Sequence, residues 1–331
     1  MKIGVFNTVR GGAKRFSHLT TNYNGEIEFI QLEVSATDEN AEKITGCEAV
    51  IFTPYKSITH AFYDGLVKAG VKYVLTCTAG FDHLDIEYMK KVGLKSANAP
   101  IYSPNSVAEY AVLSLLAILR TYKEQIHRID SNNFALGFTL GREIRNQVIG
   151  IIGAGRIGCT TMKCLSGFGP KEILANDIIE HNEVKKYAKY VSIEEIYEKC
   201  DAIIFHCNYT NENHHMINDE TIAKMKDGVY IVNVARGGLC NTKALIRGIQ
   251  SGKIAGLAID VLDEENEIRN AGQVDTCPVP ELEELLKNQN VIYTPHSAFY
   301  TDQALQDMSD ITAQNAYEYK TTGACSFELV K

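Results

Sequence analysis

The sequence predicts an α/β protein made of two doubly wound parallel-sheet domains. Short apolar runs alternate with segments of helical composition along most of the chain, which is typical of parallel sheets covered by helices on both faces. The alternation is interrupted near residue 103 by one long helix-like segment. A chain of 331 residues is long for one hydrophobic core and sufficient for two.

The first hundred residues supply the elements of the first domain. Helices are expected at residues 61–70 and 87–93, between apolar runs. The expected strands are residues 2–6, 27–32, 49–52, 73–77 and 94–100.

Residues 103–129 are predicted to form one long helix where the chain crosses between domains. Ser103 can cap it, Pro104 suits its first turn, and apolar residues recur every three or four positions. We therefore predict a discontinuous first domain, residues 1–101 and 300–331, with a second domain at 102–299 inserted into it.

A second alternating series follows this helix. Most of its strands are apolar throughout, as expected for strands buried on both faces, and helices are expected between them, at 192–200 and 242–253. One more helix is expected at 301–323. The expected strands are residues 147–152, 172–177, 202–206, 230–235, 254–260 and 291–295.

The composition favours a small-molecule partner. A net charge of −8 and a pI near 5.7 argue against binding to nucleic acid or to an anionic membrane surface. The apolar stretch at 111–119 is about half a membrane span, and the one at the N-terminus is too short for a signal peptide. We expect a cytoplasmic protein.

Cysteine and histidine usage indicates no metal site. The nine cysteines are scattered without a C-x-x-C pair, so neither a disulfide framework nor a zinc site follows. His214 and His215 are adjacent in a polar segment, and adjacent side chains need further ligands from elsewhere to hold an ion.

Three glycines in IGIIGAGRIG, residues 149–158, have the spacing G-x-G-x-x-G. Gly153, Gly155 and Gly158 follow an expected strand and open an expected helix, and Asp177 lies 19 residues after the third glycine, at the end of the next strand. This context is typical of a Rossmann-type dinucleotide site, in which the acid accepts hydrogen bonds from the adenosine ribose. The alternative is a tight turn with no ligand.

The residues around Asp177 favour NAD over NADP. Its carboxylate would repel a 2′-phosphate, and Ile178 and Ile179 offer no arginine to bind one.

Chemistry is expected at three strand ends of the second domain. Arg236 can bind a carboxylate with two parallel hydrogen bonds, and we interpret Gly237 and Gly238 after it as allowing a ligand to approach. Histidine is the side chain best suited to donate a proton at neutral pH, so His296 is a candidate proton donor, and Glu265 nearby would keep it protonated. The alternatives are a surface ion-pair arginine and a loop histidine after a proline.

Together these motifs resemble one family. GAGRIG, Asp177, VARGG, DVLDEE with Asp260 and Glu265, and PHSAFYTD are similar to the D-isomer-specific 2-hydroxyacid dehydrogenases, and within them to the D-lactate dehydrogenase group. The resemblance covers nearly the whole chain, including YVLTCTAGFDHLD and APIYSPNSVAEYAV.

The resemblance implies a role for each matching residue. Arg236 would orient the substrate carboxylate and carbonyl, His296 would give its proton to the carbonyl oxygen, and Glu265 would keep His296 charged. Asp260 would hydrogen-bond the nicotinamide carboxamide. Backbone amides of Ala79 and Gly80, and the side chain of Tyr102, would bind substrate. The cofactor would be lined by Gly153, Gly155, Arg156, Ile157, Gly158, Asp177, His206, Cys207, Asn208, Val234, Ala235 and Asp260.

The resemblance also implies the architecture. It predicts a flavodoxin-like substrate domain and a Rossmann-type NAD domain that close on the substrate, a homodimer formed through the NAD domain, and an (R)-2-hydroxy acid product. Three positions depart from the family. Asn208 replaces a usual proline, Asn241 a common aspartate at a helix cap, and Cys77 a frequent arginine beside the substrate turn.

The substrate is expected to be a 2-oxo acid with an apolar side chain. Phe52, Tyr102, Phe299 and Tyr300 would form an aromatic wall, although each is also consistent with core packing, and no cation stands at Phe52 for a second carboxylate. Pyruvate is the first expectation, followed by branched and aromatic 2-oxo acids. The alternatives are 2-oxoglutarate as substrate, or an NAD-sensing corepressor-like binding protein.

Overall fold

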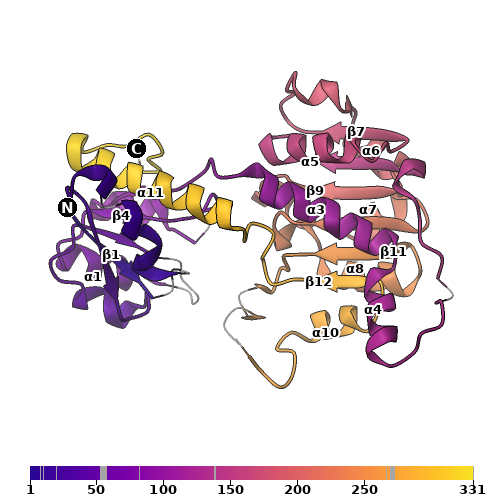
Figure 1. The fold of residues 1–331 in the computed structure, drawn as a ribbon, viewed down its shortest axis with the longest axis horizontal. Helices are drawn as coiled ribbons and strands as arrows, with labels where there is room; N and C mark the ends of the chain where they lie inside the picture. Colours follow the sequence, from indigo (N-terminus) through magenta and orange to yellow (C-terminus); the bar gives the residue numbers. More distant parts are fainter. Residues whose placement is uncertain are drawn as a thin grey trace. The chain divides into compact units, whose positions relative to one another are not determined.

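The chain divides into two compact units in the computed structural model. One comprises Met1–Ser103 and Thr301–Lys331, the other Pro104–Tyr300 (Figure 1). The sequence places these divisions after residues 101 and 299. The structure describes residues 1–7, 9, 11–19, 21–52, 58–81, 83–137, 139–265, 267–268 and 273–330.

The first unit is built on a parallel sheet with the strand order β2-β1-β3-β4-β5 among the described residues. This is the flavodoxin-like order, so the predicted fold of this domain is confirmed. The long C-terminal helix packs against η1 and β4. The elements are β1 (Lys2–Phe6), η1 (Gly12–Leu19), η2 (Thr21–Tyr23), β2 (Glu28–Leu32), η3 (Asp38–Lys43), β3 (Ala49–Ile51), α1 (His60–Lys68), β4 (Tyr73–Leu75), α2 (Ile86–Val92), β5 (Lys95–Ala97) and α11 (Asp302–Thr322).

The second unit contains a larger parallel sheet, of order β12-β11-β10-β9-β6-β7-β8 in the described chain. The order reverses between β6 and β9, which is where such sheets bind ligands. The elements are α3 (Pro104–Leu119), α4 (Tyr122–Asp130), η4 (Ile144–Asn146), β6 (Val148–Ile152), α5 (Arg156–Ser166), β7 (Glu172–Asn176), η5 (Val184–Lys186), β8 (Lys189–Tyr190), α6 (Ile193–Lys199), β9 (Ala202–Phe205), η6 (Asn211–Asn213), α7 (Asp219–Lys224), β10 (Val229–Asn233), η7 (Gly237–Leu239), α8 (Thr242–Gln250), β11 (Ile254–Ile259), α10 (Pro280–Leu286) and β12 (Val291–Tyr293).

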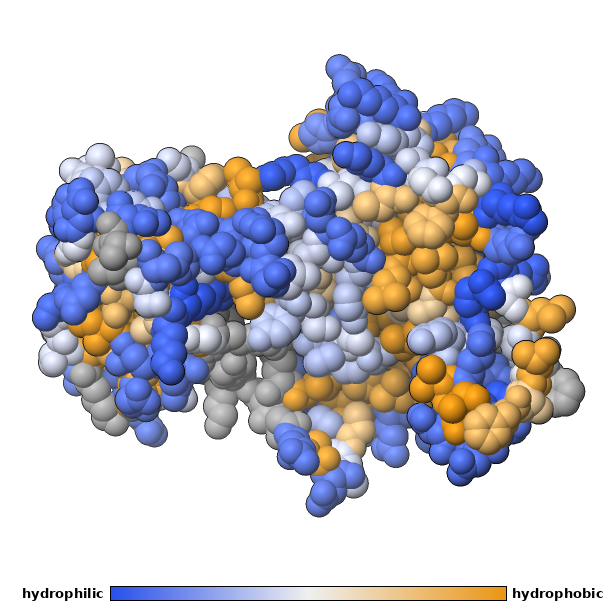
Figure 2. Space-filling view, viewed as in Figure 1, coloured by the Kyte–Doolittle hydropathy of each residue, from blue (hydrophilic) through white to orange (hydrophobic). Residues whose placement is uncertain are grey.

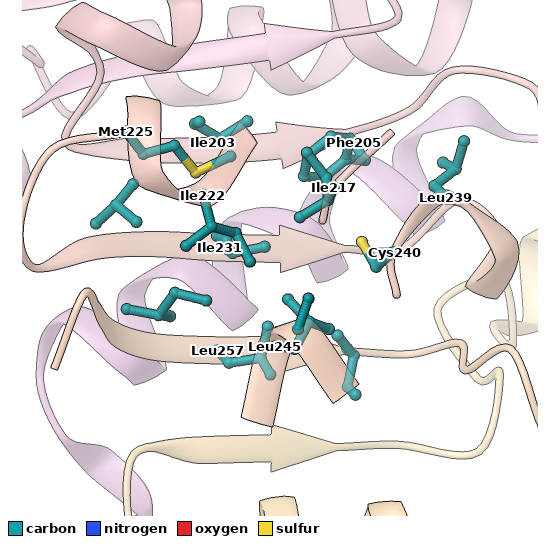
Figure 3. Close-up of a cluster of buried hydrophobic side chains, with 14 of the residues drawn as sticks. Ile203, Phe205, Ile217, Ile222, Met225, Ile231, Leu239, Cys240, Leu245 and Leu257 are labelled. Atoms are coloured by element: carbon teal, nitrogen blue, oxygen red, sulfur yellow. The ribbon is translucent and has the colours of Figure 1, made fainter. Parts of the chain in front are cut away.

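Helices cover both faces of this sheet, and alternate strand residues point to opposite faces. Ile149 and Ile151 of β6 pack in the cluster under α3 and α5, whereas Ile152 packs in the cluster with α6, α7 and α8. Figure 3 shows part of that second cluster, with Ile203, Phe205 and Ile231 from the strands beside Leu245 of α8 and Leu257 of β11. The wholly apolar strands predicted from the sequence are therefore buried on both faces.

The predicted long helix at 103–129 is wrong in one respect, because the structure breaks it into α3 and α4. Thr121 has a left-handed backbone, with φ of 48°, and its hydroxyl donates to the carbonyl of Arg120 at 2.8 Å. Gln125 Nε2 donates to the same carbonyl at 2.6 Å. In a continuous helix, the Arg120 carbonyl would accept a hydrogen bond from the backbone N–H four residues later. The two side chains compete with that backbone bond, and such competition ends helices.

The other predicted elements agree with the structure in type and place. Pro104 is the first residue of α3, and the last helix spans Asp302–Thr322. The two-residue strand β8 is an addition that the sequence pattern does not indicate. Among the described residues, every helix is too short or too polar to cross a bilayer.

Candidate active site

The glycine loop follows β6 at the point where the strand order reverses. Gly153 has φ of 95°, and a Cβ built on it would lie 2.2 Å from the backbone nitrogen of Cys207, after β9. A Cβ on Gly158 would lie 2.0 Å from the carbonyl oxygen of Gly153. Any side chain at either position would collide with backbone, so both glycines are required for the turn and for packing of α5 on the strand.

Gly155 differs from these two glycines because a Cβ on it would meet no atom within 4 Å. It is the N-cap of α5, and both Gly155 and Arg156 are exposed. The open space lies at the N-terminus of an 11-residue helix, where backbone N–H groups and the helix dipole favour an anion. The loop therefore fits the pyrophosphate of a dinucleotide, which would contact Gly155 directly.

Asp177 lies at the end of β7, beside this loop. One carboxylate oxygen accepts from the Ala154 N–H at 2.5 Å and the other from the Ile179 N–H at 3.2 Å. The side chains of Ile178 and Ile179 are exposed, at 98% and 58%. The acid is thus bonded to the glycine turn itself, where it can accept from the ribose hydroxyls, and the two residues after it carry no charge.

The other predicted cofactor residues line this edge mainly with backbone. Val234 and Ala235 are each 8% exposed, and Ile157 packs against the cluster under α3.

The His206 ring is bonded to Thr161 Oγ1 of α5 at 2.9 Å, and burial lowers the pKa of this imidazole to about 3. Burial raises the pKa of the neighbouring Cys207 thiol to about 11. Both side chains are therefore neutral near pH 7.

Backbone hydrogen bonds join the ends of β10, β11 and β12. The Asp260 N–H donates to the Asn233 carbonyl at 2.9 Å, and the His296 N–H donates to the Asp260 carbonyl at 2.8 Å. In a parallel sheet the carboxyl ends of strands share one edge. The loops that carry Arg236, Glu265 and His296 thus start from three neighbouring strands on the edge that also holds the glycine loop.

His296 and Glu265 form the pair that the sequence predicts. His296 Nδ1 lies 2.6 Å from Glu265 Oε1, with the two side chains 27% and 16% exposed. A carboxylate at Nδ1 orients the ring and stabilises its protonated form. It also leaves Nε2 as the ring nitrogen that can reach a substrate.

Asp260 follows β11 as a buried carboxylate that bonds the loop of His296. Its side chain is 1% exposed, and its oxygens accept from the backbone N–H groups of Ser297 and Ala298 at 2.9 and 2.8 Å. They also accept from the hydroxyls of Thr294, at 2.6 Å, and Ser297, at 3.3 Å. These bonds fold the loop around His296, whose φ is 50°. The bond to the nicotinamide carboxamide that the resemblance implies stays a prediction.

The glycines after Arg236 have a different cause from the one predicted. A Cβ on Gly237 would lie 2.0 Å from the Leu262 carbonyl, and one on Gly238 would lie 2.8 Å from the Tyr209 ring. They are glycines because the protein itself packs closely there, not because a ligand approaches. The Arg236 side chain is partly exposed, and its Nη1 donates to the Ala235 carbonyl at 2.8 Å.

In the first unit, side chains fix the turn that contains Ala79 and Gly80. Asn98 Nδ2 donates to the Ala79 carbonyl at 2.6 Å, and Thr78 Oγ1 donates to the Gly80 carbonyl, also at 2.6 Å. A trans peptide points its N–H opposite to its carbonyl, so the Gly80 and Phe81 N–H groups face away from these side chains. The turn can therefore present backbone donors to a carboxylate.

The predicted aromatic wall is only partly supported. Phe52 has no exposed surface and packs edge-on against Phe62 in the core of the first unit, so its place in the wall is wrong. Phe299 lies edge-on to His296, with ring centroids 6.2 Å apart, and Tyr300 is 51% exposed beside it. Tyr102 is partly exposed, two residues before α3.

The three departures from the family have different consequences. The Asn241 side chain caps α8 by accepting from the Ala244 N–H at 2.9 Å, so an aspartate is not needed for the cap. Cys77 is buried with its thiol 3.2 Å from Thr312 of α11, and burial raises its pKa. Asn208 is exposed, and its carbonyl accepts from Asn213.

The adjacent histidines are engaged with protein groups. His215 Nε2 lies 2.8 Å from Asp263, and His214 Nδ1 lies 3.1 Å from the Tyr209 hydroxyl. A search of the described residues finds no group of three or more His, Cys, Asp or Glu side chains arranged to hold a metal ion.

Sequence reasoning missed Asn98, Thr78 and Asn233. Asn98 and Asn233 are 4% and 1% exposed, and each holds the backbone at a strand end. Polar residues at the end of an expected buried strand are the signal that could have found them, because buried polar groups must be hydrogen-bonded.

Comparison with known proteins agrees with this geometry. The model of the D-isomer specific 2-hydroxyacid dehydrogenase NAD binding domain matches residues 112–298. The chain is 43% identical over 262 residues to an aromatic 2-oxoacid reductase from Clostridium sporogenes, covering 79% of each protein. It is 36% identical over 302 residues to a D-lactate dehydrogenase from Lactobacillus delbrueckii subsp. bulgaricus, covering 91% of this chain and 90% of that protein.

A solved structure is similar along the whole chain. It is that of D-2-hydroxyisocaproate dehydrogenase, with a TM-score of 0.90, 26% identity and coverage of 100% of both chains.

Proposed function

Because this chain belongs to the D-isomer-specific 2-hydroxyacid dehydrogenases and is thus an NAD-dependent oxidoreductase, we propose that it reduces 2-oxo acids with apolar side chains, aromatic ones included. The observation that carries the proposal is the 2.6 Å contact between His296 Nδ1 and Glu265 Oε1, on the sheet edge that also holds the glycine loop. A protonated imidazole on that edge can protonate a carbonyl oxygen as it gains negative charge.

We assign the roles as follows. NADH, when bound, supplies the hydride. Arg236 binds the carboxylate with two parallel hydrogen bonds, which positions the 2-oxo group. His296 Nε2 gives its proton to the carbonyl oxygen, and Glu265 holds the ring in place and stabilises its charge. The reverse direction uses the same residues, with His296 as the base.

In the first unit, we propose that the backbone amides of Ala79 and Gly80, together with the Tyr102 side chain, also bind the substrate. The bond from Asn98 to the Ala79 carbonyl supports the role of Gly80, because the N–H of the same peptide faces away from Asn98. These residues and the (R) configuration of the product follow the family resemblance.

The preference for an apolar side chain has two supports. Phe299 and Tyr300 are adjacent aromatic residues, and Phe299 lies against His296, the proposed proton donor. A relative that is 43% identical bears the name aromatic 2-oxoacid reductase. Pyruvate, 2-oxoisocaproate and phenylpyruvate all have side chains that such a surface can contact without leaving a charge unpaired.

A comparison of rates tests the proposal. NADH oxidation is followed with pyruvate, 2-oxoisocaproate, phenylpyruvate and 2-oxoglutarate at matched concentrations. We expect the highest kcat/KM with one of the three apolar substrates, and Phe299→Ala should reduce it most for phenylpyruvate. A clear preference for 2-oxoglutarate would overturn the apolar specificity. Tight NAD binding without turnover of any 2-oxo acid would instead favour a sensor.

The second unit carries an apolar surface that we propose as the contact between two copies of this chain. Helix α4 buries none of its own residues, and its exposed residues Tyr122, Ile126 and Ile129 are spaced for one helix face. Phe134 and Leu136 after it are 75% and 96% exposed. Figure 2 shows apolar surface over α3 and at α4. A patch of this kind on an otherwise charged surface is typical of an association site.

The assembly is tested by mass measurement in solution. Sedimentation should give the mass of a homodimer, and Leu136→Asp should give a monomer. A monomeric parent protein would contradict the proposal.

A cytoplasmic location, with small acids as the partners instead of membranes or nucleic acid, remains our prediction from the composition.

A further inference from the structure

His215 has no role in the proposed reaction, yet its backbone joins the segment that follows Arg236. Its N–H donates to the Gly238 carbonyl at 2.8 Å, and its φ is 50°. Ile217 donates to Leu239 at 3.0 Å, and Asn241 donates back to Ile217 at 2.8 Å. Residues 215–217 therefore run beside 238–241 as a short parallel ladder, two residues beyond Arg236.

The His215 ring extends from this ladder to the loop that carries Glu265. Nε2 lies 2.8 Å from Asp263 Oδ2, and Nδ1 lies 3.3 Å from Asn241 Nδ2. Asp263 is two residues before Glu265. One imidazole thus links the segment after Arg236 to the turn that positions Glu265.

The partner at Nδ1 determines the tautomer of the ring. Asn241 Oδ1 accepts from the Ala244 N–H at the cap of α8, so the amide turns its NH₂ group toward His215. An amide NH₂ only donates, and Nδ1 must therefore accept. The proton is then on Nε2, which donates to Asp263, and the ring is neutral.

A second contact holds the same turn. Thr242 Oγ1, on a buried residue of α8, donates to Glu264 Oε2 at 3.0 Å. Asp263 and Glu264 are thus each held by a partner from the segment 215–242, and Glu265 follows them directly toward His296.

We propose that His215 is a positioning residue for the reaction. Its neutral imidazole, held between Asn241 and Asp263, keeps the loops of Arg236 and Glu265 in their relative places without touching the substrate. The inference rests on the roles proposed for Arg236, Glu265 and His296. Misplacing such groups by about 1 Å can cost about 10²-fold in rate.

His215→Asn is the main test. Asparagine tolerates a left-handed backbone, and its side chain is too short to reach both partners. We expect kcat/KM to fall by about 10- to 100-fold with the Kd for NADH within about twofold of the parent. The fall should lie in kcat more than in KM, because a displaced Glu265 no longer holds His296 where the carbonyl oxygen gains charge.

The chain offers a matched control next to it. His214 stacks on His215 with ring centroids 3.7 Å apart, and its Nδ1 lies 3.1 Å from the Tyr209 hydroxyl instead of from Asn241 or Asp263. His214→Asn should keep kcat/KM within about twofold of the parent, since both contacts of His215 remain.

Changes at the partners sharpen the test. Asp263→Asn retains an acceptor for Nε2–H and should keep most of the activity, whereas Asp263→Ala should resemble His215→Asn.

Asn241→Asp places an acceptor at Nδ1, so the ring should become doubly protonated near pH 7. Ring ¹⁵N shifts of labelled His215 report this directly, independently of activity.

The outcomes separate the inference from the proposed function. Unchanged kcat/KM in His215→Asn, or a loss explained entirely by unfolded protein in the thermal transition, overturns the inference alone. An ¹⁵N spectrum of the parent with the proton on Nδ1 does the same. Full activity of His296→Gln overturns the proposed roles and the inference with them.

Discussion

The carboxyl edges of the two sheets present different chemical groups. In the first unit, the side chains of Asn98 and Thr78 hold the backbone, and the groups left to bind a ligand are peptide N–H donors. In the second unit, backbone bonds and the side chains of Asn233 and Asp260 hold the loops, and the groups presented are charged side chains. The first edge offers neutral dipoles and the second offers formal charges.

Under the proposed roles, the two edges should contribute different terms to the reaction. Backbone donors in a fixed turn bind a carboxylate in substrate and transition state alike, which lowers KM without raising kcat. A protonated imidazole acts where charge develops, which raises kcat. Changes at the first edge should therefore affect KM, and changes at the second edge kcat.

The largest effect is expected for His296→Gln, which removes the proton donor of the second edge. Glutamine can still hydrogen-bond but cannot supply a proton, so kcat should fall by about 10²- to 10⁴-fold. NADH binding, measured by fluorescence titration, should be unchanged. Turnover like that of the parent protein would remove His296 from the mechanism.

Asp260→Asn should have the next largest effect. The amide would place an NH₂ group against a backbone N–H of Ser297 or Ala298, leaving a buried donor unpaired. We expect about 1–3 kcal/mol less free energy of unfolding, and a lower kcat because the His296 loop loosens. Urea unfolding and steady-state kinetics measure the two. Thr294→Val, which removes one neutral donor to the same carboxylate, is the milder control.

Asn98→Ala tests the first edge. Without the 2.6 Å bond to the Ala79 carbonyl, the peptide that presents the Gly80 N–H can rotate. KM for the 2-oxo acid should rise by about tenfold, equivalent to about 1.4 kcal/mol, with kcat little changed. Asn315→Ala is the control, since Asn315 bonds the Asn98 carbonyl and not the turn. A fall in kcat at constant KM would contradict the contrast between the edges.

The last effect is on stability at low pH and concerns His206, which burial keeps neutral beside the glycine loop. Its pKa is lowered from 6.5 to about 3, so below pH 6.5 the unfolded chain binds a proton that the folded protein does not. Stability therefore falls as pH decreases from 6.5 toward 3. Between pH 6.5 and 4.5, the free energy of unfolding should fall more steeply than in His206→Gln, by about 1 kcal/mol per pH unit. Parallel pH curves for the two proteins would show that His206 does not contribute.

Much of the fold follows from local pattern. The apolar strands, the helices between them and the glycine loop were predictable because strand burial, helix periodicity and turn chemistry are recorded in neighbouring residues. The break at Thr121 was not, because it depends on which hydroxyl and amide capture the Arg120 carbonyl. The short strand β8 has too few residues to show a pattern.

The candidate site also contains features that the sequence predicts and features that it does not. His296 and Glu265 could be paired from the sequence, because each follows a strand and each carries a group suited to proton transfer. Gly237 and Gly238 were assigned to a ligand, although it is the Leu262 backbone and the Tyr209 ring that exclude a side chain there. A glycine shows that space is lacking, but not what fills it.

By itself, the sequence determined the fold class, the NAD loop with its acid, and the candidate reacting residues, because each depends on residue type at a spacing along the chain. Only the tertiary structure decided that Phe52 belongs to the core, that Asp260 folds the His296 loop, and that His215 joins two loops. These facts depend on which groups meet across distances of 26 to 48 residues in the chain. The free energy of such contacts comes from burial and hydrogen-bond geometry, which no local spacing records.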